Sequence, residues 1–410
     1  MNKLPEDWEI KKLKDIGNVY TGITPPTSDK ENFGNEHLFV TSADIKENKY
    51  IFNSIRKLSN KGFEKTKKFK KGDILYVCIG SIGKIALAKT DFSCNQQINV
   101  LRVNKEIDNE FIYYQLMNSF PYISKFISKR VVPIMNKTTF ENLEISLPPL
   151  DEQKRIASAL SKIDAYLENT IKLIEEKERF KRGIAKKLLT CKEGENIPEA
   201  RFRGFEDEWE IVKLGDIGTI TATGVDKKIN DNETPIKLLN YLDVFNRNKL
   251  YEKEISYMTT ATEKQLEKCN IRKGDLFITP SSEDKKGIAK SSVAMEDFKN
   301  TVYSYHIIRV RFNKEIDLKF KSYMCDTDFF HRQAYRLCDG SGQRYFIKLD
   351  NFRNMEICIP KSIKEQEKIG GYLSLLDKEI DNLKKQKELI KEMKRGAMQK
   401  LLSGEVRLLE

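Results

Sequence analysis

The residue types best suited to chemistry in this sequence are amides and lysines in short polar stretches. Asn95, Gln96 and Gln97 stand in a row directly before an expected strand. Amide side chains pair with adenine through two hydrogen bonds in the major groove of DNA, so this row could read bases. Amides also cap turns, and that second interpretation stays open.

A lysine-rich stretch lies upstream of this row. It contains one acid, Glu64, and its basic residues are Lys61, Lys65, Lys67, Lys68, Lys70 and Lys71. Such a stretch can neutralise phosphates without reading sequence, or it can form a solvated basic face. The whole chain has 73 Lys and Arg against 61 Asp and Glu, a net charge of +12. This balance suits a polyanionic partner, although many soluble proteins share it.

Two further polar loops lie in the second half of the chain, at Ser281 to Lys286 and at Ser341 to Arg344. Arg344 could pair with a guanine edge or with a phosphate. For the rings of Tyr303, Tyr305 and His306, packing within a strand is the expected role and loop contacts are the alternative. The second half therefore also offers candidate nucleic-acid contacts, of different residue types.

Motifs for catalysis are missing. The glycines around Ser81 form Gly80-Ser81-Ile82-Gly83-Lys84, which lacks the four-residue spacer and the following Ser or Thr of a phosphate-binding loop. A glycine turn between two strands is the better interpretation. Neither the glycine-rich loop nor the Asn-Pro-Pro-aromatic motif of an adenine methyltransferase is present. We therefore expect a non-catalytic chain.

Cysteine and histidine are too scattered for a metal site. The seven cysteines form no Cys-x-x-Cys pair, and the three histidines are His37, His306 and His331. Scattered cysteines without a secretory signal are typical of the reducing cytoplasm, which is the expected location. No run of 18 apolar residues occurs, so no membrane span is expected.

The elements that must position these residues occur twice. Trp8–Gly17 returns as Trp209–Gly218 with eight of ten positions identical, and Asn104–Asp108 returns unchanged as Asn313–Asp317. A repeat of this length indicates a duplicated domain rather than a solenoid unit. We expect two similar globular domains, at 1–150 and 209–361. The stretch from Val225 to Thr260 has little counterpart in the first copy.

The first domain reads as a set of short strands and turns. Apolar runs predict strands at 73–79, 84–88 and 98–103, and a short helix is expected at 111–117. A linker at 191–208, rich in turn residues, leads into the second domain, whose landmarks repeat those of the first.

Each domain runs into a long charged helix, at 151–190 and at 362–410. Apolar residues recur there in steps of three and four, as in one helical stripe. About 38 residues at about 1.5 Å each would span about 57 Å, and a narrow stripe favours pairing of the helices as an antiparallel coiled coil. The predicted fold is therefore α+β, with two mixed α/β domains joined by two long antiparallel helices in an internal pseudo-twofold repeat.

Several of these motifs are distinctive when they occur together. The first domain opens with Trp8-Glu9-Ile10 and Thr21-Gly22-Ile23-Thr24-Pro25, and its interior contains Gly72-Asp73-Ile74-Leu75, Gly80-Ser81-Ile82-Gly83-Lys84 and Asn95-Gln96-Gln97. The first long helix is entered through Leu147-Pro148-Pro149-Leu150-Asp151-Glu152-Gln153, which is repeated at Pro360, Glu365 and Gln366, and the second domain is entered through Arg201-Phe202-Arg203-Gly204-Phe205. In these the chain resembles the specificity subunit of Type I restriction–modification systems. The second domain departs from that pattern, since it lacks Gly-x-Thr-Pro and the Asn-Gln-Gln row.

The resemblance implies a DNA reader that is not itself an enzyme. Each domain would be a target recognition domain that reads one half of a bipartite, asymmetric site in double-stranded DNA. The helices would set the spacer and dock two modification subunits, which bind S-adenosylmethionine and methylate adenine, so this chain would need no cofactor. Restriction subunits, which are ATP-dependent translocases and nucleases, would join to cleave.

The contact residues follow from the motifs and the resemblance together. The candidates for DNA contact are Thr21, Thr24, Lys67, Lys68, Lys70, Ser81, Asn95, Gln96 and Gln97 in the first half, and Thr223, Lys227, Ser281, Lys285, Gln343 and Arg344 in the second. The candidates for partner docking are Glu152, Gln153, Arg182, Glu365, Gln366 and Arg395.

Two other classes of protein fit parts of the sequence. A coiled-coil scaffolding protein with two protein-binding heads would show the same repeat and helices, but salt-dependent DNA binding would distinguish it. A nuclease or methyltransferase in its own right would need catalytic motifs, and activity of the isolated chain with S-adenosylmethionine or magnesium would reveal it.

Overall fold

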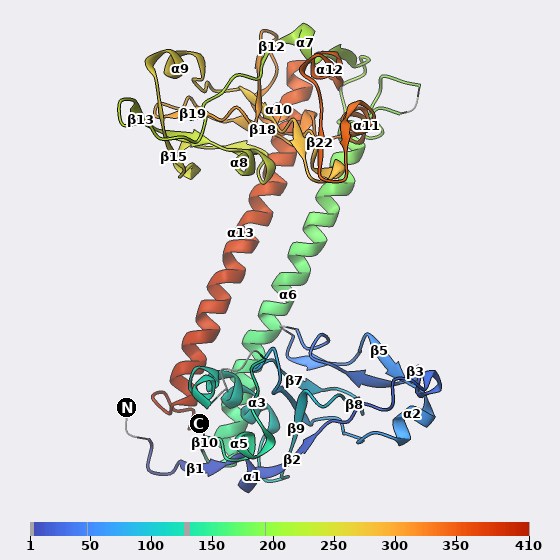
Figure 1. The fold of residues 1–410 in the computed structure, drawn as a ribbon, viewed down its shortest axis with the longest axis vertical. Helices are drawn as coiled ribbons and strands as arrows, with labels where there is room; N and C mark the ends of the chain where they lie inside the picture. Colours follow the sequence, from blue (N-terminus) through green and yellow to red (C-terminus); the bar gives the residue numbers. More distant parts are fainter. Residues whose placement is uncertain (1–3, 47, 127–131, 193, 410) are drawn as a thin grey trace. The chain divides into compact units, whose positions relative to one another are not determined.

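The computed structural model describes residues 4–46, 48–126, 132–192 and 194–409 (Figure 1). These residues form two compact units, one running up to Lys172 and resuming at Lys384, the other from Leu173 to Leu383. Two helices of 40 residues, α6 (Leu150–Leu189) and α13 (Ile363–Leu402), each contribute one part to each unit. The stripe predicted at 151–190 is thus a single helix.

The first unit is built in layers. A five-stranded sheet has the order β2-β9-β6-β7-β4, and a three-stranded sheet has the order β5-β3-β8. Its strands are β1 (Glu9–Lys12), β2 (Gly17–Thr21), β3 (Phe33–Val40), β4 (Tyr50–Ile51), β5 (Arg56–Leu58), β6 (Ile74–Val77), β7 (Ile85–Ala88), β8 (Ser93–Cys94), β9 (Ile98–Val103) and β10 (Glu144–Leu147). Its shorter helices are α1 (Leu13–Ile16), α2 (Asn60–Glu64), α3 (Asn109–Asn118), α4 (Phe120–Ile123) and α5 (Lys137–Glu141), with 3-10 turns η1 (Lys30–Asn32) and η2 (Ser124–Phe126).

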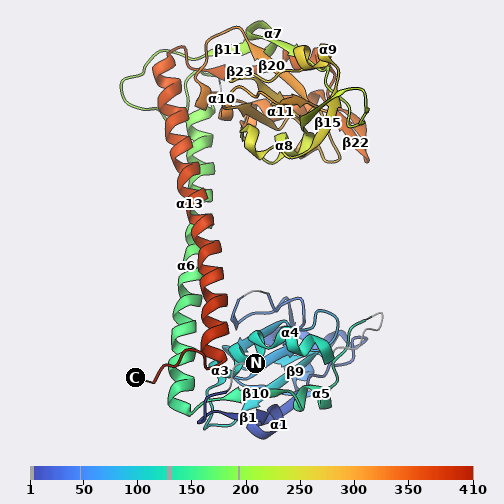
Figure 2. The same ribbon diagram turned by 90° about the vertical axis from the view of Figure 1, so that its left-hand side faces the viewer.

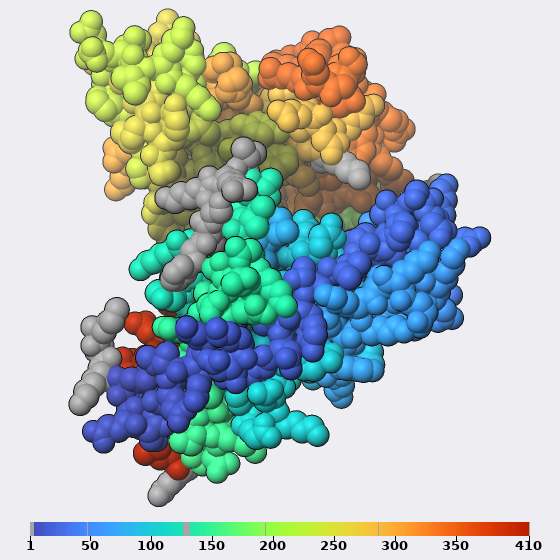
Figure 3. Space-filling view, turned by 60° about the horizontal axis from the view of Figure 1, so that its bottom comes forward, coloured from blue at the N-terminus to red at the C-terminus, as the bar shows by residue number. Residues whose placement is uncertain are grey.

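The five-stranded sheet is buried on both faces. Along β6, Ile74 and Tyr76 face the core shared with α3, α6 and α13, while Leu75 and Val77 face the core under the three-stranded sheet. Because successive side chains of a strand point to opposite faces, one apolar run supplies both cores. The strand and helix predictions at 73–79, 84–88, 98–103 and 111–117 are confirmed by β6, β7, β9 and α3. In Figure 3 the segment from β3 to α2, in blue, forms the right-hand surface of this unit.

The second unit repeats this order strand for strand. Its five-stranded sheet is β12-β20-β16-β18-β14, its three-stranded sheet is β15-β13-β19, and β11 pairs with β23 as β1 pairs with β10. The shared strands are β11 (Glu210–Lys213), β12 (Gly218–Thr221), β13 (Thr234–Leu239), β14 (Lys249–Leu250), β15 (Met258–Ala261), β16 (Leu276–Ile278), β18 (Ser291–Ala294), β19 (Thr301–Tyr303), β20 (Ile308–Phe312) and β23 (Glu356–Ile359). The duplication predicted from sequence is therefore a duplication of topology.

The second unit also has a sheet for which the described part of the first unit shows no equivalent. This sheet has the order β17-β22-β21, from β17 (Ser281–Ser282), β21 (Asp339–Ser341) and β22 (Arg344–Phe346). The shorter helices of the second unit are α7 (Leu214–Ile217), α8 (Tyr241–Phe245), α9 (Glu263–Lys268), α10 (Leu318–Met324), α11 (Asp328–Leu337) and α12 (Leu349–Asn354), with η3 (Glu252–Glu254) and η4 (Lys285–Gly287).

One expectation about the second domain is wrong. The stretch from Val225 to Thr260 diverges in sequence, yet it forms β13, α8, β14 and the start of β15, which take the places of strands in the first unit. The physical reason is that only the inward apolar positions, such as Leu238 and Leu250, are needed to build the core. The structural difference lies instead in the added sheet.

The two long helices lie side by side within each unit (Figure 2). In the second unit Lys177 pairs with Glu379 at 2.7 Å and Lys181 pairs with Asp377, so the helices run antiparallel. In the first unit Lys394 pairs with Asp164 at 2.6 Å. Within the described residues, none of the helices combines the length and apolar character that crossing a membrane requires.

Candidate nucleic-acid interface

Three turns of the first domain meet at one surface. They follow β2 at Gly22–Thr24, follow β3 at Thr41–Asp44, and precede β9 at Asn95–Gln97. The first and third turns approach so closely that a Cβ on Gly22 would lie 2.3 Å from the carbonyl oxygen of Asn95. Only glycine permits this approach, which explains the residue at that position.

Hydrogen bonds between side chains hold these turns together. The Thr24 hydroxyl donates to Gln96 Oε1 at 2.6 Å, and the Ser42 hydroxyl donates to Gln97 Oε1 at 3.2 Å. Asn95 Nδ2 donates to the same Gln97 oxygen at 2.9 Å. Gln96 is exposed, and its amide is held by the Thr24 hydroxyl. The row predicted from sequence is therefore a positioned set of amides, with Gln96 outermost.

Two of these turns recur in the second domain with the same hydrogen bonds. Asn95 N donates to Val40 O at 3.1 Å, and Ser304 N donates to Leu239 O at 3.0 Å. Asp44 Oδ2 accepts from Thr41 N at 2.8 Å, just as Asp243 Oδ2 accepts from Asn240 N at 3.0 Å. Ser304-Tyr305-His306 therefore takes the place of Asn95-Gln96-Gln97, and Asn240-Tyr241-Leu242-Asp243 takes the place of Thr41-Ser42-Ala43-Asp44.

The side chains that these second turns display are different. Tyr305 and Leu242 are exposed, whereas Tyr303 is fully buried, so the packing role expected for the aromatic residues holds for Tyr303 and is wrong for Tyr305. Burial, helped by Lys227 and Arg344, lowers the pKa of His306 below its ordinary value. The imidazole is then neutral at pH 7 and can both donate and accept a hydrogen bond.

A cavity of about 500 Å³ collects several predicted residues of the second domain. It is lined by Tyr241, Leu242, Phe245, Ser281, Ser282, Glu283, His306, Gln343 and Arg344. Arg344 donates to the Ser281 hydroxyl at 3.1 Å, which joins β22 to β17. Lys285 lies over the Tyr345 ring, and Thr223 is exposed after β12. The added sheet thus brings Gln343 and Arg344 beside the turn that carries His306.

The lysine-rich stretch of the first domain is more neutral than the sequence indicated. Although Glu64 is its one acid in sequence, the fold adds Asp29, Glu31 and Asp91. Lys61 and Lys65 pair with Asp29, Lys68 pairs with Glu64, and Lys70 pairs with Asp91 at 2.7 Å. Such surface pairs are weak, so a phosphate could still displace the acids. Lys67 and Lys71 are exposed, and no ion pair to either is found among the residues that the structure describes.

The remaining candidates of the first domain, Thr21 and Ser81, have different structural roles. The Thr21 hydroxyl donates to Asn99 Oδ1 at 2.8 Å and is used inside the sheet. Ser81 is exposed in the turn between β6 and β7, where Gly80 and Gly83 both have positive φ. In that turn Lys84 Nζ donates to the carbonyl of Ser42 at 3.1 Å. The turn that resembled a phosphate loop is therefore a glycine turn that borders the three-turn surface.

Comparison with known proteins decides the family. The family described as Type I restriction modification DNA specificity domain matches residues 5–176 and 206–392, which is one match for each repeat. The chain belongs to this family. The two matched regions begin just before Trp8 and Trp209, at the start of the two recognition domains.

Relatives of similar length support the same family. The MjaVIII specificity subunit of Methanocaldococcus jannaschii is 25% identical over 410 residues, covering 99% of this chain and 94% of the relative. The MjaIX specificity subunit of the same organism is 26% identical over 426 residues, covering 100% and 96%. The fold is shared with the S subunit of a Type I restriction–modification system from M. genitalium, at TM-score 0.57 and 17% identity, covering 98% of this chain and 97% of that one. The fold is also shared with a chain from a structure on the assembly of the type I R-M system, at TM-score 0.62 and 16% identity, covering 99% of this chain and 100% of that one.

The two Glu-Gln pairs that start the long helices are buried, so the prediction that they dock a partner is wrong. Glu152, Gln153, Glu365 and Gln366 are each at most 2% exposed. Gln153 accepts from Asp108 N at 3.0 Å and donates to Pro148 O at 2.8 Å, and Gln366 makes the same two bonds to Asp317 N and Pro360 O. Their polar atoms are used to fasten each recognition domain to its helix.

Each buried glutamate forms a lock with a tryptophan and an arginine. Glu152 accepts from Trp8 Nε1 at 3.1 Å and from Arg407 at 2.8 Å. Glu365 accepts from Trp209 Nε1 at 3.4 Å and from Arg201 at 2.8 Å. The two locks explain the tryptophan that opens both repeats: the indole N–H satisfies a carboxylate that is otherwise out of reach of water.

A buried lysine ties the first recognition domain to the helices. Lys49 Nζ donates to three side chains, Glu110 at 2.8 Å, Tyr114 at 3.0 Å and Ser161 at 2.7 Å. Tyr114 in turn donates to Asp164 at 2.5 Å, and Asp164 pairs with Lys394 of α13. Burial lowers the pKa of Lys49, and Glu110 partly offsets that effect.

The second recognition domain repeats this arrangement. Lys249 Nζ donates to Tyr323 and Ser374, each at 2.9 Å, and Tyr323 donates to Asp377 at 2.5 Å. Asp377 pairs with Lys181 of α6, as Asp164 pairs with Lys394. Both hubs place a domain lysine between a domain tyrosine and the helix pair, but Lys49 pairs with Glu110 of its own domain whereas Lys249 pairs with Asp377 of the helix.

Arg182 and Arg395 remain accessible for docking. Both are exposed, at equivalent positions of α6 and α13, and each follows an exposed apolar residue by two positions, Phe180 and Met393. An exposed apolar side chain beside an arginine is typical of protein interfaces. These four residues define what we call the paired helix patches.

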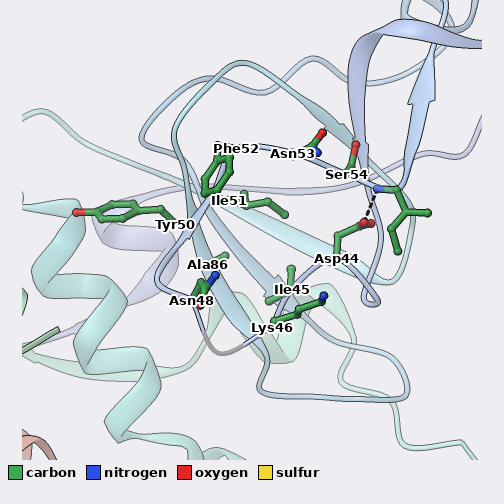
Figure 4. Close-up of a pocket in the computed structure, with 11 residues that line it drawn as sticks. Asp44, Ile45, Lys46, Asn48, Tyr50, Ile51, Phe52, Asn53, Ser54 and Ala86 are labelled. Carbon is green, nitrogen blue, oxygen red and sulfur yellow. Dashed lines mark hydrogen bonds between the residues drawn. The ribbon is translucent and has the colours of Figure 1, made fainter. Parts of the chain in front are cut away.

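A shallow pocket of the first domain lies under the loop between β3 and β5 (Figure 4). Asp44 Oδ1 accepts from Ile55 N at 2.7 Å and so folds the loop back, leaving Phe52 and Ile55 exposed at its rim. The pocket has a volume of about 250 Å³. Asp44 is used within the loop and only Lys46 adds charge to the lining, so the pocket lacks the convergent polar groups of a ligand site.

Sequence reasoning missed Ser42, Tyr241, Leu242 and Phe245 as surface candidates. The signal was present, because Thr41…Asp44 and Asn240…Asp243 share a polar residue followed three positions later by Asp, directly after a strand. The divergence of 225–260 from the first copy conceals the match between the two. Among the described residues, no three His, Cys, Asp or Glu side chains come together to hold a metal ion.

Proposed function

We propose that this chain is the DNA-reading subunit of a Type I restriction–modification complex, in which each recognition domain reads one half of a bipartite site. The carrying observation is that two of the three turns recur with different side chains: amides at Asn95–Gln97 in the first domain, and Tyr305 with His306 in the second. Amides in the first half suit adenine, and Arg344 in the second suits guanine. The expected DNA contacts of the second half are Gln343, Arg344, His306 and Lys227.

Methylation in this proposal belongs to partner subunits in the cytoplasm. Modification subunits would bind S-adenosylmethionine and methylate adenine, restriction subunits would cleave, and this chain would supply neither a cofactor site nor a nucleophile. The isolated chain, mixed with labelled S-adenosylmethionine and DNA, should transfer no methyl group. Transfer without an added subunit would contradict a purely reading role.

The paired helix patches are the proposed docking sites for two modification subunits. Residues 151–190 and 363–403 each contain ten Lys or Arg and seven Asp or Glu, so the two helices offer similar faces. Two similar faces favour two copies of one partner. Native mass spectrometry should show two modification subunits per chain, and Arg182→Glu and Arg395→Glu should each remove one. A stable complex with one modification subunit at excess partner would contradict this assignment.

The central experiment replaces one recognition domain. Residues 209–361 are exchanged for the equivalent domain of another member of the family, and the methylated motif is read by sequencing genomic DNA from cells that carry the modification subunit. Only one half of the motif should change. A change in both halves would show that the domains do not read independently.

The helices are proposed to set the spacer between the two halves. Four residues inserted after Glu176 add about 6 Å of helix at about 1.5 Å per residue. DNA advances about 3.4 Å per base pair, so the unread spacer should grow by one or two pairs while both halves stay the same. A spacer of unchanged length would mean that something other than the helices fixes the distance.

A scaffolding role, the other function considered from sequence, is not favoured. The family match covers both heads of the chain rather than its helices alone. The two roles differ in salt dependence, since DNA binding through phosphates weakens steeply with salt.

A further inference from the structure

Two cysteines of the second unit lie in contact. Cys191, in the linker that follows α6, and Cys358, on β23, have their sulfurs 2.8 Å apart. A disulfide bond is about 2.05 Å long, so the two sulfurs need to approach by less than about 1 Å to form one. Both side chains are partly exposed, and both line the same cavity of about 860 Å³. A small oxidant can therefore reach them.

The other five cysteines are differently placed. Cys78, Cys94, Cys269 and Cys325 are buried, and burial raises the pKa of each thiol. Cys338 is partly exposed, but its sulfur contacts the carbonyl of Tyr335 rather than a second thiol. The contact with Cys358 lowers the pKa of Cys191, because the Cys358 S–H stabilises a Cys191 thiolate. Cys191 is thus the thiol of the pair best prepared to attack an oxidant.

The pair has no equivalent in the first recognition domain. On the strand that matches β23, Ser146 stands opposite Ile10 where Cys358 stands opposite Ile211. After the helix that matches α6, Gly404 follows Leu401-Leu402-Ser403 where Cys191 follows Leu188-Leu189-Thr190. The two thiols therefore belong to the second domain alone, and the first domain serves as an internal control.

We propose that Cys191 and Cys358 are a reversible redox site that hydrogen peroxide closes into a disulfide. The Cys191 thiolate attacks one peroxide oxygen, the O–O bond breaks, and a sulfenic acid and hydroxide form. The Cys358 thiol then attacks the sulfenic sulfur, an S–S bond forms, the S–O bond breaks, and water leaves. In sum two thiols and one peroxide give one disulfide and two waters, and a dithiol reverses the reaction.

The disulfide would covalently link the two ends of the second recognition domain. The bond joins the linker that leads into the domain to the strand that leads out of it, so the closed loop contains β11 and everything up to β23. A crosslink over so long a loop stabilises mainly by restricting the unfolded chain. Opening of this domain then becomes rarer, while the first domain is unaffected.

The site is tested on the full-length chain with hydrogen peroxide. After brief oxidation, free thiols are alkylated and the unreduced digest is examined by mass spectrometry. A peptide that links Cys191 to Cys358 should accumulate and should disappear after dithiothreitol. Cys358→Ser should abolish it and leave a sulfenic acid at Cys191 that dimedone traps, and serine is tolerated because Ser146 holds the matching position in the first unit.

A second cysteine variant serves as the control. Cys338→Ser should leave the crosslink unchanged, since Cys338 takes no part in it. If Cys338 is oxidised while the Cys191–Cys358 peptide stays absent, the two thiols are not a redox site. Crosslinks between other cysteines at the same peroxide concentration would also overturn the proposal.

The closing effect is measured by hydrogen exchange on the oxidised and reduced chain. Exchange in the linker at 194–200 and in β11 and β23 should slow by at least about tenfold, as for a crosslink of ordinary strength. Exchange in β1 and β10 should not change. Equal slowing of both strand pairs, or none in β11 and β23, would contradict closure of the second domain.

Discussion

The two recognition domains keep the same support and change what they display. The supporting bonds recur almost atom for atom: Trp8 with Glu152 and Trp209 with Glu365, or Gln153 with Asp108 and Gln366 with Asp317. The turns also keep their backbone bonds, yet two glutamines on one become a tyrosine and a histidine on the other. The comparison teaches that the exposed side chains of the turns can change while the buried bonds that hold each domain to the helices stay the same. A duplicated protein that reads two different DNA sequences requires this.

The largest effect should come from breaking the locks. Arg201→Ala and Arg407→Ala each leave a glutamate at most 2% exposed without its cation, so each should lower the free energy of unfolding by about 3 kcal/mol. Arg407 also pairs with Asp7, which makes its loss the larger of the two. Urea unfolding of the full-length chain measures both, with the exposed Arg203→Ala as control. Losses no larger than that of the control would show that the locks do not hold the domains.

The next largest effect should be a difference in stability between variants of the two lysine hubs, the bonds around Lys49 and those around Lys249. Lys49→Met leaves Glu110 without a cation, whereas Lys249→Met leaves Asp377 still paired with Lys181. We expect a loss of about 2 kcal/mol for the first, because Glu110 loses its cation but is only partly buried and keeps its bonds from Tyr50 and Ser161. We expect about 1 kcal/mol for the second. Thermal unfolding, with the exposed Lys46→Met as control, gives the comparison. Equal losses would mean that the hubs contribute alike despite their different acids.

Acid should weaken both hubs. The pKa of Glu110 lies below its ordinary value of 4.5 and that of Asp377 below 3.8, because bonds from Lys49 or Lys181 outweigh burial. The unfolded chain therefore binds these protons more readily, and the stability that the groups contribute is present above pH 4.5 and lost as the pH falls through and below these values. Melting temperatures between pH 3 and pH 7 should show this decline. In Lys49→Met the decline should be smaller, and an unchanged slope would exclude Glu110 as its source.

Local patterns were sufficient to predict much of the fold. The apolar run of β6 and the stripe of α6 each depend on neighbours in sequence, so the strand at 74–77 and the helix at 150–189 could be recognised. The Trp-Glu-Ile repeat revealed the duplication for the same reason. What sequence divergence concealed was the shared topology of 225–260, because a core tolerates many apolar residues while the surface changes freely.

Roles that depend on distant partners could not be predicted. Glu152 and Gln153 looked accessible in a charged helix, and only the fold brings Trp8 and Arg407 onto them. The lysines of 61–71 looked unopposed because Asp29 and Asp91 lie far along the chain. His306 gained its place beside Arg344 through a sheet for which the described residues of the first domain show no equivalent.

The central claim is that equivalent turns read different halves of one site. The most direct measurement is the methylated motif of cells that carry Gln96→Ala or His306→Ala, each beside the unchanged modification subunit. Removing one base contact costs about 1–3 kcal/mol of discrimination, so each variant should relax about one position of the motif. Gln96→Ala should relax one half only, His306→Ala the other half only, and the spacer should stay the same in both. Relaxation of the same half by both variants, or of both halves by either one, would contradict the account.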